Sequence, residues 1–210
     1  MKRLICLGIG LLVYAIPVET YARPVSYPGG WTVSQTNNGE ANTLLLHYSP
    51  TARYSLGYKF EYWRDGDFTV NALQMNNLLK RWNNEESQAN LYLKSGIGIA
   101  HGDHETSPAA YTGLATDWED RRFFASYENR YTEAGDVDDF FTQSARVGVA
   151  PYIGNYGDIH TWLMLEVSHA PENDEKITIT PLVRFFKGVQ LLEAGMTNHG
   201  EVLLNAIYRF

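Results

Sequence analysis

Cysteine and long apolar runs are both scarce in this 210-residue chain. The only cysteine is Cys6, and it lies within the one extended apolar stretch, Leu4 to Val18. Pro17 interrupts that stretch, which is also shorter than the roughly 20 apolar residues that a membrane helix needs. The sequence therefore excludes a helical membrane protein, and it offers neither a disulfide framework nor a cysteine-based zinc site.

The apolar stretch has the character of an export signal. Lys2 and Arg3 precede it, and Thr20-Tyr21-Ala22 follows it as a site for cleavage. A positive start, a short apolar segment and a small residue at the end are typical of a secretory signal peptide. We predict a signal peptide over residues 1–22 and a single exported domain over residues 23–210.

Positive charge is also in short supply. The chain has 17 Lys and Arg against 24 Asp and Glu, which gives a formal net charge of −7. An acidic chain of this kind is a poor partner for nucleic acid, so we exclude nucleic-acid binding. Aromatic residues, by contrast, are plentiful, with 14 Tyr, 9 Phe and 5 Trp.

The rest of the chain alternates between apolar and polar residues with a period of two. The clearest segment is Arg53 to Trp63, where Tyr54, Leu56 and Tyr58 alternate with small or charged residues. This period indicates a β-strand whose two faces meet unlike environments. The same pattern recurs in four further segments: Gln88 to His101, Arg122 to Tyr131, Phe141 to Val149 and Ile159 to Val167.

Weaker strands fit between these five. They are Trp31 to Thr36, Thr43 to Tyr48, Phe68 to Trp82, Ala109 to Trp118, Lys176 to Phe186, Val189 to Met196 and Glu201 to Phe210. We therefore predict 12 strands, with 10 or 8 as alternatives. Two features leave the count open: the apolar phase slips within Phe68 to Trp82, which predicts a bulge, and Pro181 stands where a ladder donor is needed.

Alternation alone fits a soluble β-sandwich or a lipocalin-like barrel as well as a membrane barrel. Here the polar face is too charged and too rich in glycine for an ordinary core. Aromatic residues also gather at strand ends, as Phe123 with Tyr131, where membrane barrels carry interfacial girdles. The sequence therefore favours an all-β fold, a closed antiparallel transmembrane up-and-down barrel.

The last strand adds a resemblance. Val202, Leu204, Ala206, Tyr208 and Phe210 place an apolar residue at every second position up to the end. This pattern resembles the assembly signal, here Tyr208 and Phe210, of Gram-negative outer-membrane β-barrel proteins of the porin-like kind. The resemblance implies insertion by the barrel-assembly machinery into outer-membrane lipid and lipopolysaccharide, with both termini in the periplasm. It names no subfamily and no oligomeric state.

Such a topology places alternate connections outside the cell, where they hold 13 acidic and two basic residues. Histidines and carboxylates that could bind metal gather there: His101, Asp103, His104, Glu105, His169 and His199. Imidazole together with carboxylate suits Zn, Cu or Ni, so a divalent metal ion is a possible ligand of these loops. A solvated acidic rim that binds divalent ions loosely explains the same residues, and both interpretations stay open.

Charged residues on the opposite face of the strands are expected to line the lumen. They are Lys59, Glu61, Lys94, Glu128, Arg130, Arg146, His160, Glu166 and Arg184. They predict either a narrow polar channel or a set of ion pairs that fills the barrel, because a 12-stranded barrel lies between filled and open sizes.

An enzyme would need a nucleophile with its base. The candidate pairs are Asp103 with His104 and Asp158 with His160, and neither has a recognisable motif around it. The sequence therefore favours a non-enzymatic small channel or surface cation-binding protein with an acidic, histidine-containing rim and no required cofactor. An outer-membrane hydrolase of lipase or protease type and a soluble periplasmic binding protein are the alternatives.

Overall fold

The computed structural model describes residues 24–155, 157–173 and 175–210. The predicted signal peptide, residues 1–22, lies outside the described residues. Within the described ranges there is no helix of the length and apolar character needed to cross a membrane.

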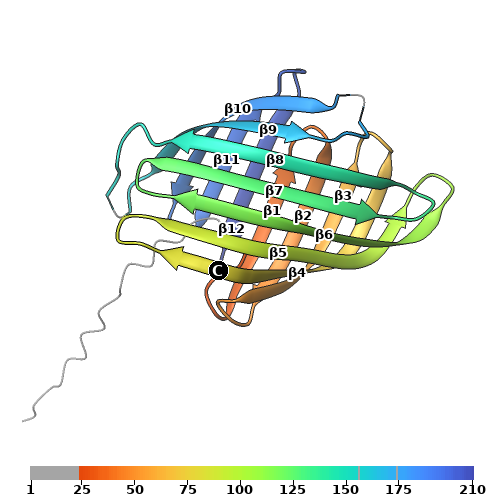
Figure 1. The fold of residues 1–210 in the computed structure, drawn as a ribbon, viewed down its shortest axis with the longest axis horizontal. Helices are drawn as coiled ribbons and strands as arrows, with labels where there is room; N and C mark the ends of the chain where they lie inside the picture. Colours follow the sequence, from red (N-terminus) through yellow and green to blue (C-terminus); the bar gives the residue numbers. More distant parts are fainter. Residues whose placement is uncertain (1–23, 156, 174) are drawn as a thin grey trace, which may run out of the picture.

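The described residues form 12 strands in one closed sheet (Figure 1). The strands are β1 (Gly30–Asn37), β2 (Ala41–Ser49), β3 (Tyr54–Trp63), β4 (Phe68–Asn83), β5 (Gln88–His101), β6 (Thr106–Glu119), β7 (Phe123–Glu133), β8 (Asp139–Val149), β9 (His160–His169), β10 (Ile177–Lys187), β11 (Gln190–Met196) and β12 (Val202–Arg209). Each pairs antiparallel with its neighbours in sequence, and β1 pairs with β12 to close the barrel. The predicted closed antiparallel barrel of 12 strands is confirmed.

Both irregularities expected from the sequence have a structural explanation. The register of β4 against β5 shifts between Leu78 and Lys80, so that Leu79 is an extra residue and the phase slip is a bulge. Pro181 pairs with Leu165 on β9, whereas the ladder between β10 and β11 extends only to Leu182. The proline therefore lies beyond the paired part of that edge, where its missing N–H costs no ladder bond.

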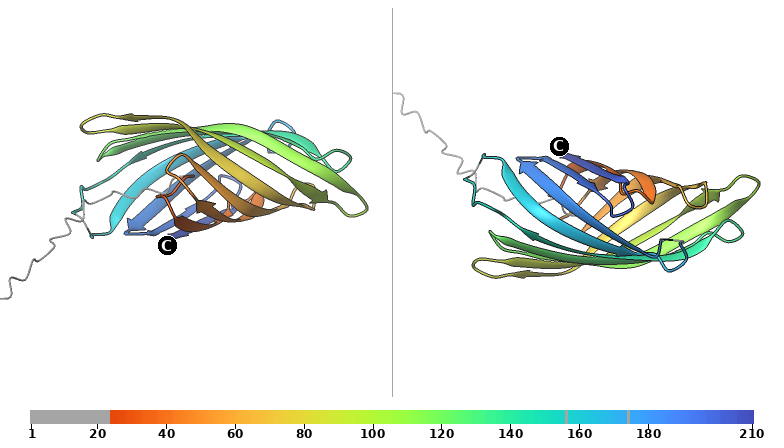
Figure 2. Two further views of the ribbon diagram at one scale, coloured as in Figure 1. Left: turned by 90° about the horizontal axis from the view of Figure 1, so that it is seen from below. Right: turned by 90° about the horizontal axis from the view of Figure 1, so that it is seen from above.

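The strands differ in length, and this makes the barrel lopsided. Strands β4, β5 and β6 have 14 to 16 residues, whereas β1, β11 and β12 have seven or eight. The wall made by the long strands projects at both ends (Figure 2). Strands β4 to β9 cross obliquely over those of the opposite wall (Figure 1).

The two ends of the barrel differ in what they carry. We call the terminus end the one with residues 24–29, Phe210 and the turns 50–53, 84–87, 120–122, 150–159 and 188–189. The acidic end carries the loops 38–40, 64–67, 102–105, 134–138, 170–176 and 197–201. Between the strand bounds, the loops of the acidic end hold 11 acidic and two basic residues, against four and three in the turns of the terminus end.

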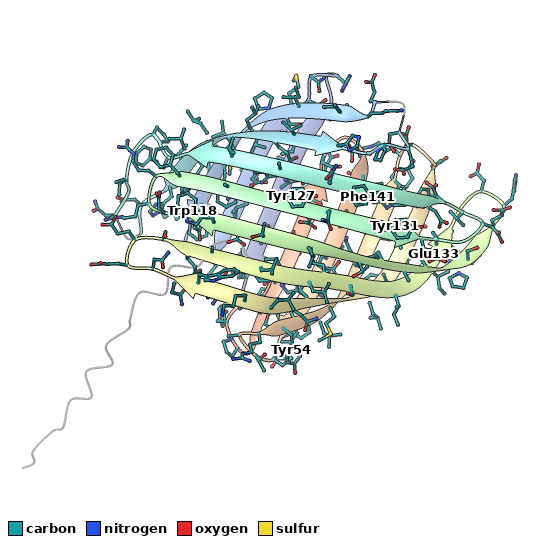
Figure 3. The ribbon with its side chains drawn as sticks, viewed as in Figure 1. Tyr54, Trp118, Tyr127, Tyr131, Glu133 and Phe141 are labelled. Atoms are coloured by element: carbon teal, nitrogen blue, oxygen red, sulfur yellow. The ribbon has the colours of Figure 1, made fainter. Side chains whose placement is uncertain are left out.

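The outer face of the barrel is apolar. Leu73 and Ile97 pair across β4 and β5 and are 60% and 69% exposed. Soluble proteins rarely expose a continuous apolar surface as large as a whole wall of the barrel. Aromatic side chains lie towards the two ends, as Trp118 and Tyr131 do in Figure 3. Tyr208 and Phe210 also face outwards and stack with ring centroids 5.8 Å apart. An outer face of this kind suits lipid.

A charged residue on this outer face should destabilise the barrel more, the nearer it lies to the middle of the membrane. Tyr58 lies in the middle of β3 and Phe123 at the terminus end of β7, and both side chains are exposed. We expect Tyr58→Arg to lower the free energy of unfolding in lipid vesicles by about 2–4 kcal/mol and the control Phe123→Arg by about 0–1 kcal/mol. Denaturant titration of the refolded proteins measures both. Equal stability of Tyr58→Arg and wild type would mean that the outer face does not meet lipid.

Candidate functional site in the lumen

Two opposite walls of the barrel are joined inside the lumen by a cluster around Glu61. The guanidinium of Arg130 on β7 donates to both carboxylate oxygens of Glu61 on β3, at 2.6 and 2.7 Å. The Lys59 ammonium lies 2.8 Å from the same carboxylate. Arg130 also lies over the ring of Tyr111, with 3.9 Å between the guanidinium carbon and the ring centroid. We call Lys59, Glu61, Tyr111 and Arg130 the Glu61 cluster.

A glycine allows Arg130 to reach across the lumen. A Cβ atom at Gly113 on β6 would lie 1.9 Å from the carbonyl oxygen of Asn129 and 2.9 Å from the Cα of Arg130. The ladder between β6 and β7 lacks its regular pairs at this point, and the Leu114 amide donates instead to the Asn129 side chain at 3.1 Å. Only glycine leaves room for this close approach of the β7 backbone to β6.

A second set of charges lies around Glu193. Its carboxylate accepts from Arg184 at 2.6 Å, from Asn205 at 2.7 Å and from Arg146 at 2.8 Å. Arg146 also donates from Nε to Glu166 at 2.9 Å. Because Arg146 is on β8 and Glu193 on β11, this set also bridges strands that are not neighbours. We call Arg146, Glu166, Arg184, Glu193 and Asn205 the Glu193 cluster.

The predicted lumen residues are therefore placed inside the barrel and mostly paired. Lys94 completes the set with Glu128, at 2.6 Å. His160 begins β9 at the terminus end, with its ring 6.3 Å from that of Phe186. Sequence reasoning missed Glu193, although the apolar residues at alternate positions of Val189 to Met196 carry the signal that would have found it. It also missed Tyr111 and the lumen amides, which no charge pattern marks.

A polar cavity of about 320 Å³ remains between the two clusters. Charged side chains of both clusters, together with Gln74 and Thr142, contribute to its lining. It reaches the acidic end at Asn38 and Glu40. Beside it, Trp63, Phe68 and Phe140 pack together within the barrel, with Trp63 and Phe140 edge to face at 4.5 Å, and narrow the lumen.

The cavity meets the acidic end at a carboxyl group that is hard to ionise. Burial raises the pKa of Glu40 to about 7, and the negative charges of Glu166, Glu201 and Asp65 act in the same direction. The guanidinium of the nearby Arg64 donates hydrogen bonds to the carbonyl of Gly39 and to the side chains of Asn37 and Asn42.

Carboxylates also repel one another around Asp138, at the same end of the barrel. Burial raises the pKa of Asp138 against a hydrogen bond from the Asp139 backbone, and Asp139, Glu172 and Asp65 raise it further. Carboxylates at the acidic end are therefore close enough to influence one another electrostatically.

The predicted metal ligands are not brought together. His101 bonds Thr106 at 3.1 Å, His169 bonds Gln143 at 3.0 Å and His199 lies 3.3 Å from the Glu175 carboxylate. Asp103, His104 and Glu105 lie in the short loop between β5 and β6. No group of three or more His, Cys, Asp or Glu among the described residues is arranged to hold a metal. A specific site, still a prediction, would need these loops to move.

The candidate catalytic pairs have other roles in this structure. Asp158 accepts a hydrogen bond from the Asn155 amide at 2.9 Å and so caps the turn before β9. His160 lies beside Phe186. Asp103 and His104 are consecutive residues of an exposed loop, where two neighbouring side chains are poorly placed to hold each other in one geometry.

Comparison with known proteins supports the fold alone. No family model matches the chain, and no curated protein does. Among solved structures, the KdgM porin in complex with disordered oligogalacturonate is similar, with a TM-score of 0.51 and 10% identity over 86% of this chain and 98% of the porin. The chain has the fold of an outer-membrane porin.

Two other solved barrels match less well. A second structure of the KdgM porin has a TM-score of 0.48 and 9% identity, and LpxR from Salmonella typhimurium has a TM-score of 0.47 and 10% identity. Each comparison covers 86% of this chain and nearly all of the other, at 96% and 99% respectively. At such low identity the porin-like likeness concerns the architecture alone.

Removal of the Glu61 carboxylate should destabilise the porin-like barrel strongly. Its side chain is 3% exposed, and Glu61→Gln would leave Lys59 and Arg130 as buried cations without their anion. We expect a loss of about 3–5 kcal/mol in the free energy of unfolding. The matched control is Glu128→Gln, whose side chain is 44% exposed and for which we expect a loss below about 1 kcal/mol. Equal effects of the two changes would show that the Glu61 cluster is not structurally important.

Metal binding at the acidic end should be weak and unselective. Because the histidines lie apart, we expect calorimetric titration with Zn²⁺ and with Ca²⁺ to give similar weak binding, strongly screened by salt. The His101→Ala, His104→Ala double variant should behave as wild type does. Zn²⁺ binding that exceeds Ca²⁺ binding, weakens as pH falls through the histidine range and is lost in the double variant would instead establish the specific site.

Proposed function

We propose that this protein is a channel of low conductance in the outer membrane of a Gram-negative bacterium, and that it favours small cations over anions. The observation that carries the proposal is the polar cavity of about 320 Å³, which reaches the acidic end at Glu40. A barrel filled only for stability would not need a hydrated space of this size among its charges. The aromatic packing of Trp63, Phe68 and Phe140 beside it argues for narrow passage, hence small solutes.

The charges inside the lumen do not produce a preference for cations by themselves. In the lining of the cavity, Lys59, Lys94, Arg130 and Arg146 pair with three carboxylates, because Lys59 and Arg130 share that of Glu61. The preference comes from the acidic end, whose loops carry Glu40, Asp65, Asp67, Asp103, Glu105, Asp136, Asp138, Glu172, Asp174, Glu175 and Glu201. An opening surrounded by one sign of charge concentrates counter-ions, most strongly at low ionic strength.

The same charges argue against anionic solutes. Oligogalacturonate, with which the similar KdgM porin forms a complex, is a polyanion. In this chain 11 acidic residues lie between the strands of the acidic end, against Arg64 and Lys176. Such a polymer would be repelled before it reached the lumen, so we do not extend that ligand to this protein.

Cation preference should depend on the protonation of Glu40. Since its pKa is about 7, Glu40 is neutral at pH 5.5 and ionised at pH 8.5. We expect the reversal potential of the protein in planar bilayers, under a KCl gradient, to shift towards the potassium potential as pH rises through this range. Glu40→Gln should remove this shift near pH 7.

The control is Glu85→Gln, at an exposed turn of the terminus end, which should keep the shift. Anion preference in wild type would overturn the proposed selectivity, and the absence of any current from correctly folded protein would overturn the channel.

A further inference from the structure

The first described residues lie inside the barrel at the terminus end. The carbonyl of Pro24 accepts a hydrogen bond from the Ser55 hydroxyl at 2.9 Å. Two residues later the Ser26 amide donates to the Ser49 hydroxyl at 3.0 Å. Ser49 and Ser55 belong to β2 and β3 and are completely buried. The segment is thus held against the inner face of the wall and not across its rim.

Val25, between these two contacts, belongs to an apolar cluster inside the barrel. It is 4% exposed and lies in one cluster with Tyr92 of β5 and Ala115 of β6, against which Leu78 of β4 packs. Tyr92 is itself completely buried. One short segment therefore hydrogen-bonds β2 and β3 and shares an apolar cluster with side chains of β4, β5 and β6.

The polar cavity stops short of this segment. Its lining contains side chains from the middle and the acidic end of the barrel, and none of the residues that contact residues 24–26. On the other side of the terminus end, Phe124, Trp162 and Met164 pack together and fill the space. A solute in the cavity therefore meets residues 24–26 where β2 to β6 would otherwise leave a way out.

We propose that residues 24–26 form a plug that closes the terminus end of the lumen and that its release opens the lumen to small solutes. This inference rests on the proposed channel function. The predicted cleavage after Ala22 would leave only Arg23 ahead of the plug, so that release needs the withdrawal of a chain end and no rearrangement of a strand.

The plug carries an unpaired buried group of its own. The Ser26 hydroxyl is buried and has no hydrogen-bond partner among the described residues. This group opposes the seated state, and water could satisfy it after release. Among the described residues, two hydrogen bonds and the burial of Val25 favour the seated state.

A chain of hydrogen bonds connects the plug to the cavity. Ser55, which binds Pro24, accepts from Asn76 at 2.9 Å. Asn76 accepts from Gln74 at 2.8 Å, and Gln74 accepts from the Tyr111 hydroxyl at 2.8 Å. Tyr111 lies under Arg130 in the Glu61 cluster. A solute that hydrogen-bonds Gln74 or Tyr111 would therefore compete with the contacts that hold the plug.

A reversible covalent lock tests the plug directly. The mature chain has no cysteine of its own, because Cys6 lies in the predicted signal peptide. In Ser26→Cys, Ser49→Cys, oxidation should tie the plug to β2, and cross-linking is verified by mass spectrometry. We expect the oxidised protein in planar bilayers to carry severalfold less current than the same protein after reduction. The two single-cysteine variants are the controls and should not respond to the reductant.

A second variant tests the plug without a cross-link. Val25→Asp places a charge in an apolar contact and should displace the segment, so we expect severalfold more current than in wild type. The matched control, Val189→Asp, makes the same change in an exposed turn of the terminus end and should behave as wild type does. Because Val25 lies in no strand, assembly of the barrel is not at risk, and heat-dependent migration in detergent gels verifies it.

The outcomes separate the plug from the channel. Equal currents in the locked, reduced and Val25→Asp proteins would overturn the plug and leave the channel standing. No current in any of them would overturn both proposals. A measurable current in wild type that rises severalfold in Val25→Asp would support both, and it would mean that the plug is seated most of the time.

Discussion

The bidentate pair between Arg130 and Glu61 joins two walls that no backbone hydrogen bond connects. Strands β3 and β7 are separated by three others in the sheet, yet the guanidinium and the carboxylate meet at 2.6 and 2.7 Å. A closed sheet satisfies all its backbone groups within itself, but it does not determine how far apart its opposite walls lie. In this barrel the side chains of Arg130 and Glu61 bridge that distance.

Pairing across the lumen also explains why the interior can be charged at all. Lys59, Glu61 and Arg130 are nearly buried, and each would be costly alone. Together, and with the Glu193 cluster, they form ion pairs and leave a polar cavity between them. Burial raises the pKa of Glu40, and the neighbouring carboxylates raise it further. The lumen thus has charges of both signs in its middle and is acidic at one end.

The sequence predicts the sheet better than it predicts the lumen. Alternation identified the 12 strands, the faces of their residues and an irregularity within Phe68 to Trp82, because a lipid-facing residue must be apolar at every second position. It placed Arg130 and Glu61 inside the barrel, but a period of two contains no information on which inward residues meet across the barrel. Glu193 was missed, although the apolar residues at alternate positions of its short strand place it on the inner face.

The histidines of the acidic end show the converse limit. His101, His169 and His199 lie at one end of the barrel, as the topology predicts. Each forms a hydrogen bond with a residue of an adjacent strand and not with another histidine. Two residues at the same end of the barrel can still lie far apart, since the loops are spread around the circumference of a closed sheet. Metal coordination needs several side chains to converge on one ion, and the register of the strands decides whether their loops lie close enough for this.

The N-terminal segment adds a constraint of a different kind. Residues 24–26 belong to no strand, and no periodicity marks them, yet Val25 is as buried as most inward side chains. They pack in one cluster with Tyr92 on the long strand β5 and hydrogen-bond Ser49 and Ser55 on β2 and β3. One end of the lumen is therefore shaped by charge and open, while the other is closed by a segment held through a few contacts. A barrel closed at one end by a detachable segment can keep a hydrated interior without being permanently permeable.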